Sequence, residues 1–549
     1  MKIYGIYLAY PPTVDLRAEG LGRHLGQFLK SSQERGDLRF VLACPSWMRE
    51  NLIQLLAESD IRDGSFELIA PRRKPLLLSV YQRYLAFRDK PRRGGRLHGL
   101  LKKCARIVTA IRSRTEKILV STRSSLLMTI LLIVLSCFIV IGFIAKLVAA
   151  PFTLGLSLSR RTNSALEKYP LIQKFRARAS VLASQPKHDG FATRLYRAME
   201  ETEVALMRAL IEDRNDVAAW YSPTAFWPHF NDITAPRLMC VPDVVLANFP
   251  VGFAQAGGNR FLDNFRQVEK AIDGGQHFVT YSQDAKWRML VERYQTDPAS
   301  ISVIPHGANR LDETIVVSGL PDNEAATDAL CRNFFRTALR KAVNNQYAPI
   351  FGSDDVRFLF YASQFRPNKN LLSLLRAYDY LLKRRYVTHK LVLTGDPNVM
   401  PEIAIFIAEH CLENDVLFLT RLSLQELAAC YRLADLAVNP SLSEGGCPFT
   451  FTEALSVGTP AVMARLAVTE EIITSAALQE MMLFDPYDWK DMAQRIEWGL
   501  QNQRVLLEQQ TQFYQLLAQR TWRHVVDDTV AILDRISKSQ EIAEEEMNR

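Results

Sequence analysis

The stretch LADLAVNPSLSEGGCPFTFTEALSVGTPAVM, residues 433–463, decides the fold. Its largely apolar residues 435–439 predict a buried strand. Two adjacent glycines, Gly445 and Gly446, follow in a loop, and EALSV predicts a helix that begins at Glu453. A strand, a loop and a helix in this order form the repeating unit of a parallel sheet that is covered by helices.

The same alternation continues along most of the chain. The strand-like segments of the first half are 2–10, 38–46, 66–71, 237–245, 276–294 (a strand followed by a helix) and 300–309. Those of the second half are 355–364, 388–397, 415–423 and 433–446. The sequence therefore predicts an α/β protein with two doubly wound halves, whose ligands bind at the carboxyl ends of the strands.

The composition is that of a globular protein. The chain has 549 residues, of which 48% are hydrophobic and 23% are charged, so several domains of about 150 residues would fit. Eight scattered cysteines without a C-x-x-C pair argue against a disulfide framework and against a zinc site. MKIYGIYLAYPP reads as a first strand rather than as a signal peptide, and we find no D-x-D array for Mg²⁺. We therefore expect no metal and a reducing compartment.

The net charge of +8 is unevenly distributed. Residues 71–180 contain 23 Lys and Arg but only three acids, a net charge of +20, so the remaining residues sum to 8 − 20 = −12. A mildly acidic protein thus carries a basic insert. We therefore expect no binding to nucleic acid, and we expect the insert to contact anionic membrane lipid.

The insert contains the features of a membrane segment. Lys146 is the only charged residue in 124–159, and the apolar run 126–145 is long enough to cross a bilayer. A single crossing would place two parts of one domain on opposite sides of the membrane. We therefore expect a re-entrant or in-plane hairpin that turns near Gly142 or at 149–151. The preceding amphipathic stretch could instead pack on a globular core.

These patterns predict four parts of the chain. Residues 1–70 and 190–320 would form an amino-terminal Rossmann-like domain, interrupted by the basic helical insert 71–189. A carboxyl-terminal ligand-binding domain would follow at 345–515, and a last helix at 516–537 would cross back to the first domain.

Three predicted strand ends of the second half carry polar groups at one edge of the sheet. They offer the cations Arg366 and Lys369, a glycine turn at Gly395, and the loop that precedes Glu453. Lys and Arg bind a diphosphate through charge-assisted hydrogen bonds. A carboxylate at the positive end of a helix stays ionised and can accept hydrogen bonds from vicinal hydroxyls. Each feature alone also suits a turn, a solvated surface or a helix cap.

Together these motifs resemble the retaining GT-B glycosyltransferases of family 4. The run 416–462 resembles the donor-binding core of that family, and FYASQFRPNKN, HFVTYSQDAKW, SISVIPHGAN and AEGLGRHL resemble its other landmarks. The resemblance covers most of 1–70 and 220–535 but not the basic insert. It implies the GT-B fold, in which two Rossmann-like domains face a cleft.

The resemblance also assigns roles to residues. Glu453 would hold the ribose of a nucleotide-sugar, and Lys369 with Arg366 would hold its diphosphate. Arg366, Lys369 and Glu444 would be the catalytic residues. The donor would further be bound by Gly20, Gly22, Gly395, Gly445, Gly446 and Cys447. QFRPNKN is similar to a segment of eukaryotic mannosyltransferases that act on lipid-linked oligosaccharides, which favours GDP-mannose among GDP- and UDP-linked donors.

Three departures from the family pattern weaken these assignments. Eight residues separate Glu444 from Glu453 where the family usually has seven. Gln364 takes the place of an arginine, for which Arg366 could substitute. Pro242-Asp243 replaces a His-Asp pair, and His306 in PHG is more typical of a hinge than of a catalytic group.

The resemblance implies a membrane-associated, bacterial-type hexosyltransferase. We expect it to use a nucleotide-sugar as substrate, no cofactor, and a lipid-linked or glycolipid acceptor in polysaccharide or glycolipid synthesis. It would act on the cytoplasmic face of the inner membrane as a monotopic or re-entrant protein. The alternatives are a nucleotide-sugar epimerase, a glycan phosphorylase, a glycoside hydrolase with two carboxylates, and a non-catalytic membrane scaffold with the same fold.

Overall fold

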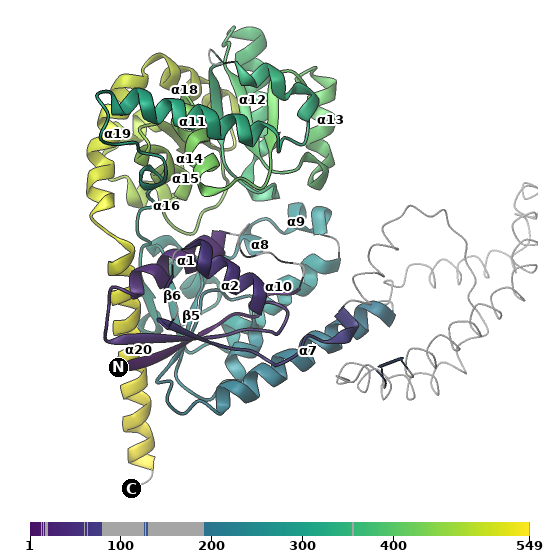
Figure 1. The fold of residues 1–549 in the computed structure, drawn as a ribbon, viewed down its shortest axis with the longest axis vertical. Coiled ribbons are helices and arrows are strands. Elements are labelled where there is room, and N and C mark those ends of the chain that lie inside the picture. The colour runs from purple at the N-terminus through teal and green to yellow at the C-terminus, as the bar shows by residue number, and fades with distance from the viewer. Residues whose placement is uncertain are drawn as a thin grey trace, which may run out of the picture.

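The computed structural model shows two stacked α/β domains, and the long carboxyl-terminal helix runs alongside the amino-terminal one (Figure 1). The structure describes residues 1–12, 14, 16, 20–59, 61–62, 64–78, 126, 128–129, 191–257, 259–353 and 356–547. Each domain has its own hydrophobic core.

The amino-terminal domain is built on a parallel sheet of seven strands in the order β3-β2-β1-β4-β5-β6-β7. The strands are β1 Lys2–Tyr7, β2 Leu38–Ala43, β3 Phe66–Ile69, β4 Trp220–Ser222, β5 Arg237–Cys240, β6 His277–Thr280 and β7 Ile301–Val303. Its helices include α1 Gly20–Ser32, α2 Arg49–Glu58, α7 Phe191–Glu212, α8 Val245–Asn248, α9 Pro250–Gly257, α10 Asn259–Asp273 and the π-helix Ala285–Arg293.

The carboxyl-terminal domain has a parallel sheet of six strands in the order β10-β9-β8-β11-β12-β13. The strands are β8 Phe358–Tyr361, β9 Lys390–Thr394, β10 Val416–Leu419, β11 Leu436–Asn439, β12 Ala461–Ala464 and β13 Leu483–Phe484. The helices are α11 Asn323–Leu339, α12 Leu371–Arg384, α13 Pro401–Glu409, α14 Leu424–Leu433, α15 Phe449–Ser456, α16 Ala467–Ile472, α17 Ala476–Met482, α18 Trp489–Gln501 and α19 Gln503–Ala518.

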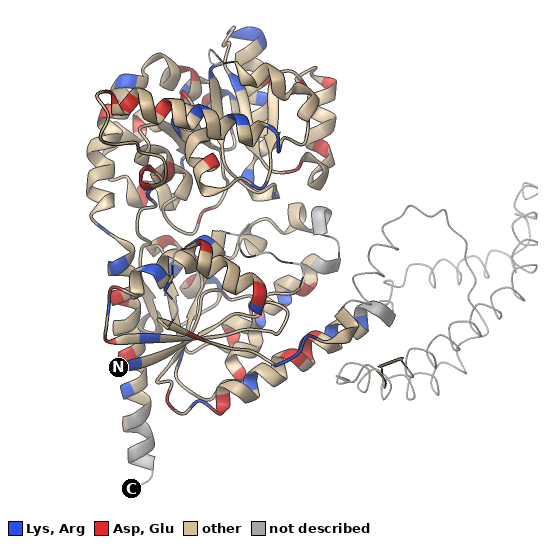
Figure 2. Ribbon diagram, viewed as in Figure 1, with Lys and Arg blue, Asp and Glu red and all other residues tan. Residues whose placement is uncertain are grey.

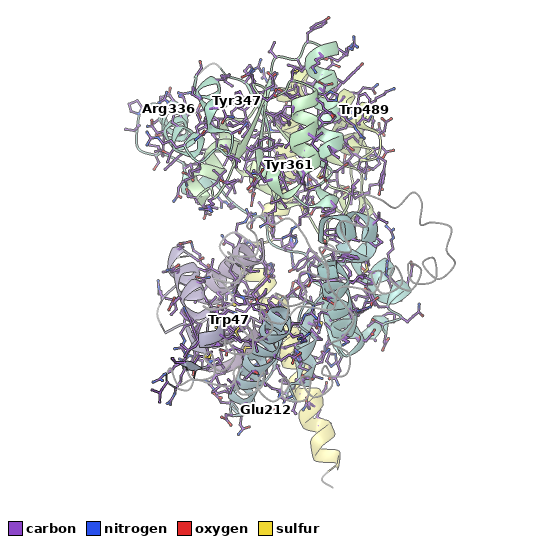
Figure 3. All side chains as sticks on the ribbon, turned by 90° about the vertical axis from the view of Figure 1, so that its right-hand side faces the viewer. Trp47, Glu212, Arg336, Tyr347, Tyr361 and Trp489 are labelled. Carbon is purple, nitrogen blue, oxygen red and sulfur yellow. The ribbon has the colours of Figure 1, made fainter. Side chains whose placement is uncertain are left out.

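The strand order of the second sheet places the candidate ligand site. The chain order reverses between β8 and β11, and ligands of such sheets bind outside the carboxyl ends of the strands at this point. The strands β9, β8 and β11 are neighbours, as the sequence predicts. Tyr361, the last residue of β8, lies in the half of its domain that is nearer to the amino-terminal domain (Figure 3).

The predicted fold class is confirmed, with differences in detail. β4, β12 and β13 were not expected, because each contains only two to four residues and none has a long apolar pattern. The observed strands are also shorter than the predicted segments. β4 packs tightly on its neighbour: a Cβ on Gly5 would lie 2.1 Å from the ring of the buried Trp220, so glycine is required there.

The last helix, α20 Trp522–Met547, leaves the carboxyl-terminal domain and packs against α1. Asp534 of α20 accepts a hydrogen bond from Lys2 Nζ at 2.7 Å and another from the hydroxyl of Tyr4. The end of the chain is thereby fixed to the first strand of the sheet. The predicted domain boundaries stay a prediction.

The structure does not describe most of the basic insert. The expected membrane hairpin, with its turn near Gly142 or 149–151, lies outside the described residues. Among the helices that are described, none is both long enough and apolar enough to span a bilayer. The helix that follows the insert, α7, carries acidic and basic residues along its length (Figure 2), and Arg197 on it pairs with Asp263 of α10 at 2.6 Å.

Candidate functional site

Two loops of the carboxyl-terminal domain are joined at the switch point between β8 and β11. The loop after β8 contains the 3₁₀ turn Pro367–Lys369, and the loop after β11 leads to Glu444. The backbone N–H of Leu442 donates to the carbonyl of Asn368 at 2.7 Å. This bond sets the distance between the two loops, because Lys369 and Glu444 follow it closely in sequence.

Lys369 and Glu444 form an ion pair at this junction. Lys369 Nζ lies 2.8 Å from Glu444 Oε1 and 3.3 Å from the hydroxyl of Ser441. Burial by itself would lower the pKa of Lys369, but the charge and hydrogen bond of Glu444 together with Tyr361 and Asp243 outweigh it, so the pKa is raised. Lys369 is therefore a fixed positive charge at neutral pH, as the binding of a diphosphate requires.

Arg366 lies at the entrance of the same turn. Its Nη2 donates to the side-chain oxygen of Gln364 at 2.7 Å, and both side chains are exposed. Gln364, which stands where the family has an arginine, therefore contacts Arg366, the arginine that could take over that role. The structure brings Lys369 and Glu444 into contact and places Arg366 near them.

The amino-terminal domain adds a carboxyl group, that of Asp243, from the loop after β5. Burial raises the pKa of Asp243 to about 6, and the negative charge of Glu444 adds to the effect. The positive charges of Lys369 and Arg366 oppose it. Asp243 thus faces the ion pair from the other domain. Sequence reasoning noted this residue only as part of an unusual Pro-Asp pair and gave it no role.

Glu453 lies in a second, deeper part of the site. Its side chain is 2% exposed, and its Oε1 accepts hydrogen bonds from Arg23 Nη1 at 2.7 Å and from Asn309 Nδ2 at 3.1 Å. Both donors precede the carboxyl-terminal domain in the sequence. Arg23 is part of α1, and Asn309 lies in the loop after β7. The sequence gave no sign of either contact, because 430 and 144 residues separate the partners.

The expected position of Glu453 at a helix start is wrong. α15 begins at Phe449, directly after Pro448, and has no acidic residue in its first turn. Proline favours a helix start because its fixed φ suits the first turn. Arg23 and Asn309, rather than the helix end, therefore provide the electrostatic environment of this carboxylate.

The glycine pair of the loop faces the other domain. A Cβ on Gly445 would lie 2.2 Å from the carbonyl oxygen of Pro242, and one on Gly446 would lie 2.9 Å from Nε2 of His306. We expected these glycines to let a ligand approach the backbone. In the structure, the absence of side chains at Gly445 and Gly446 instead allows close contact between the two domains.

Three further glycines were predicted to bind the donor. Gly20, the first residue of α1, has open space where a Cβ would be. Gly22 is packed on the backbone of Leu16, and Gly395 adopts φ +133° beside the ring of Phe365. Gly22 and Gly395 thus have a steric reason of their own to be glycine.

Two residues near the loop are electrically neutral. Burial raises the pKa of the Cys447 thiol to about 12, and the charge of Glu444 adds to this. Burial lowers the pKa of His306 to about 3, and its ring packs between Tyr281 and Phe449. A neutral ring between two aromatic rings at the domain boundary suits the hinge interpretation of His306. In the described parts of the chain, no group of His, Cys, Asp or Glu could hold a metal ion.

Comparisons with known proteins agree with this geometry. Residues 345–515 match the family model described as glycosyl transferases group 1. A search of curated proteins finds no match.

Solved structures with a similar fold cover nearly the whole chain. The N-terminal domain of trehalose-6-phosphate phosphatase from Candida albicans has a TM-score of 0.53 at 10% identity, with 98% of this chain and 97% of that chain covered. A glycosyltransferase from Rickettsia africae has a TM-score of 0.49 at 13% identity, covering 98% and 99%. Anabaena HepE in complex with UDP and glucose has a TM-score of 0.49 at 12% identity, covering 97% and 98%.

At such low identity these likenesses concern the fold. The family match covers the domain that contains Lys369, Glu444 and Glu453. Residues 345–515 therefore match the glycosyl transferases group 1 family, and the chain as a whole has the two Rossmann-like domains of the GT-B fold.

Proposed function

We propose that the protein moves a hexose from a nucleotide-sugar to a membrane-associated, lipid-linked or glycolipid acceptor, with retention at the sugar carbon. The observation that carries the proposal is the ion pair of Lys369 and Glu444 at the switch point of a glycosyl transferases group 1 domain. Glu453 is almost fully buried and pairs with Arg23 of the amino-terminal domain. The carboxyl-terminal domain thus offers a buried carboxylate for ribose hydroxyls and a fixed cation for phosphate.

The arrangement suits the electrostatics of glycosyl transfer. As the bond between the sugar carbon and the diphosphate breaks, negative charge grows on the phosphate oxygen, and Lys369 with Arg366 stabilises it. The acceptor hydroxyl forms the new bond on the same face of the sugar, and its proton passes to the leaving diphosphate. Glu444 holds the ammonium of Lys369 in place, and the motif resemblance assigns Glu444 to the hexose.

The proposal about the acceptor and the location depends on the sequence. The apolar run 126–145 inside a net charge of +20 over 71–180 favours anchoring at the cytoplasmic face of an anionic inner membrane. An acceptor with a lipid tail would meet the enzyme there. The retaining, family 4 assignment and the preference for mannose rest on the motif resemblance.

The test is a screen of GDP- and UDP-linked hexoses with membrane extracts as acceptors, followed by mass analysis of the product. We expect one donor to yield a glycosylated lipid. An epimerase would convert the donor without an acceptor, and a scaffold would bind none of the donors in isothermal titration; either result would contradict the proposal. If the product arises only on a soluble acceptor, the lipid-linked part of the proposal is wrong.

A further inference from the structure

The carboxylate assigned to the ribose already has a charged partner. Arg23 Nη1 and Asn309 Nδ2 both donate to Oε1 of Glu453, at 2.7 and 3.1 Å. Vicinal ribose hydroxyls bind a carboxylate through both of its oxygens, so they would need Oε1 as well as Oε2. Arg23, the charged donor on Oε1, would therefore compete with the ribose for Glu453.

The two donors to Glu453 differ in how freely they can leave. Asn309 is buried, and its Oδ1 accepts from Trp522 Nε1 at 3.3 Å, so both ends of its amide are held. The side chain of Arg23 is 40% exposed, and it lies in the first turns of α1, next to Gly22. Arg23 is partly exposed, so it has room to change its rotamer toward solvent, whereas Asn309 is buried.

Charge balance provides a second position for Arg23. When ribose hydroxyls satisfy Glu453, the guanidinium loses its anion, and the diphosphate that follows the ribose brings negative charge into the cleft. Guanidinium groups bind phosphates through two parallel charge-assisted hydrogen bonds. A diphosphate that follows a ribose at Glu453 would extend toward the cation Lys369, and α1, which carries Arg23, lies on the side of the amino-terminal domain that faces the carboxyl-terminal domain (Figure 1).

We propose that Arg23 is a donor-positioning residue that changes partner: it leaves Glu453 when the ribose binds there, and it then binds the diphosphate of the same donor. This inference rests on the proposed function and adds a residue to the donor site. The exchange makes the binding of the nucleoside part and of the phosphate part interdependent. It also connects the arrival of the donor to α1 and so to the amino-terminal domain.

The test compares ligands with and without phosphates. Isothermal titration of the full chain with uridine, UDP, guanosine and GDP gives the ratio of nucleoside to diphosphate dissociation constants. In Arg23→Ala we expect nucleoside affinity to rise several-fold, because the competitor is gone, and diphosphate affinity to fall. A charge-assisted hydrogen bond of about 1.5–3 kcal/mol corresponds to a change in the ratio of about 10- to 100-fold.

Two further variants separate this inference from a purely structural role. Glu471→Gln removes another carboxylate contact between the domains, the acceptor of the Gln283 and Asp284 N–H groups at 2.8 and 3.0 Å, and should leave the ratio unchanged. Arg23→Lys keeps a cation and should retain more diphosphate affinity than Arg23→Ala. If Arg23→Ala does not fold, the lysine variant still reports the ratio.

Three results would overturn the inference. Equal changes in nucleoside and diphosphate affinity would mean that Arg23 only obstructs the site. Unchanged nucleoside and diphosphate affinities in both Arg23 variants would mean that Arg23 neither competes with the ribose nor contacts the phosphates. If the wild-type protein binds neither UDP nor GDP, the proposed function itself is contradicted. If it binds them and only the results for the Arg23 variants differ from those expected, the inference about Arg23 alone is contradicted.

Discussion

The two carboxylates of the candidate site, Glu444 and Glu453, are held in different ways. Glu444 pairs with Lys369 within one domain, through loops that follow the neighbouring strands β8 and β11. Glu453 is held by Arg23 and Asn309, which precede that domain in the chain. One contact is fixed by a single sheet, while the other depends on how two domains meet. The Lys369–Glu444 pair, proposed for the phosphates, should therefore be rigid, and Glu453, proposed for the ribose, should respond to domain movement.

The largest effect is expected at the contact within the domain. Lys369→Ala with saturating donor should lower the transfer rate by about 10²–10³-fold, because a preorganised cation no longer stabilises the leaving phosphate. Lys390→Ala is a matched control, since Lys390 pairs with Asp415 at 2.6 Å and the two pairs are similarly exposed. Near-normal turnover of the Lys369 variant would remove the role assigned to this residue.

The ribose end should respond mainly in affinity. Glu453→Ala removes a buried acceptor of hydroxyl hydrogen bonds, so we expect the dissociation constant of the donor to rise about 10- to 100-fold. The loss in turnover at saturating donor should be smaller than that of Lys369→Ala. Titration with the donor checks the first expectation, and unchanged affinity would contradict the ribose assignment.

The glycine loop tests whether the domain contact itself matters. A Cβ on Gly445 would lie 2.2 Å from the carbonyl oxygen of Pro242, whereas nothing lies within 4 Å of one on Gly36. Gly445→Ala should force the domains apart and lower the transfer rate by roughly tenfold, as misplacement of catalytic groups does. Gly36→Ala serves as the control. Equal rates for the two variants would show that the contact between Gly445 and Pro242 does not contribute to turnover.

The smallest effect concerns the pH dependence of stability. The pKa of Asp243 is raised to about 6, so the folded state binds this proton more tightly than the unfolded state does. The stabilisation from this group is present at acid pH and is lost as the pH rises through about 6. The wild-type protein should therefore lose about 1 kcal/mol of stability relative to Asp243→Asn between pH 4 and 7.5, a value reduced for partial exposure.

Denaturant unfolding of both proteins at the two pH values measures this difference. If the difference in unfolding free energy between the two proteins is the same at pH 4 and at pH 7.5, the raised pKa of Asp243 is contradicted. The result would also report on the Lys369–Glu444 end of the site rather than on Glu453, because Asp243 of the amino-terminal domain faces Lys369 and Glu444.

The sequence predicted the part of the site that lies within one sheet. Arg366, Lys369 and Glu444 follow strands whose alternation with helices can be read from the residues, and parallel strands end at one edge. Arg23, Asn309 and Asp243 were missed, because their roles arise from the way two domains meet. The helix start at Phe449 was missed as well: FTFT alternates like a strand, and only Pro448 signals the helix.

The bond between Trp522 and Asn309 has a consequence for protein engineering. Residues 345–515 contain the recognisable motif, but the orientation of Glu453 depends on Asn309, which is held by the first residue of α20. A chimera that received only the matched segment would carry Glu453 without Arg23 and Asn309, which hold its side chain. The exchangeable unit is therefore larger than the domain that sequence comparison recognises, and it includes the connecting loop after β7 together with the terminal helix.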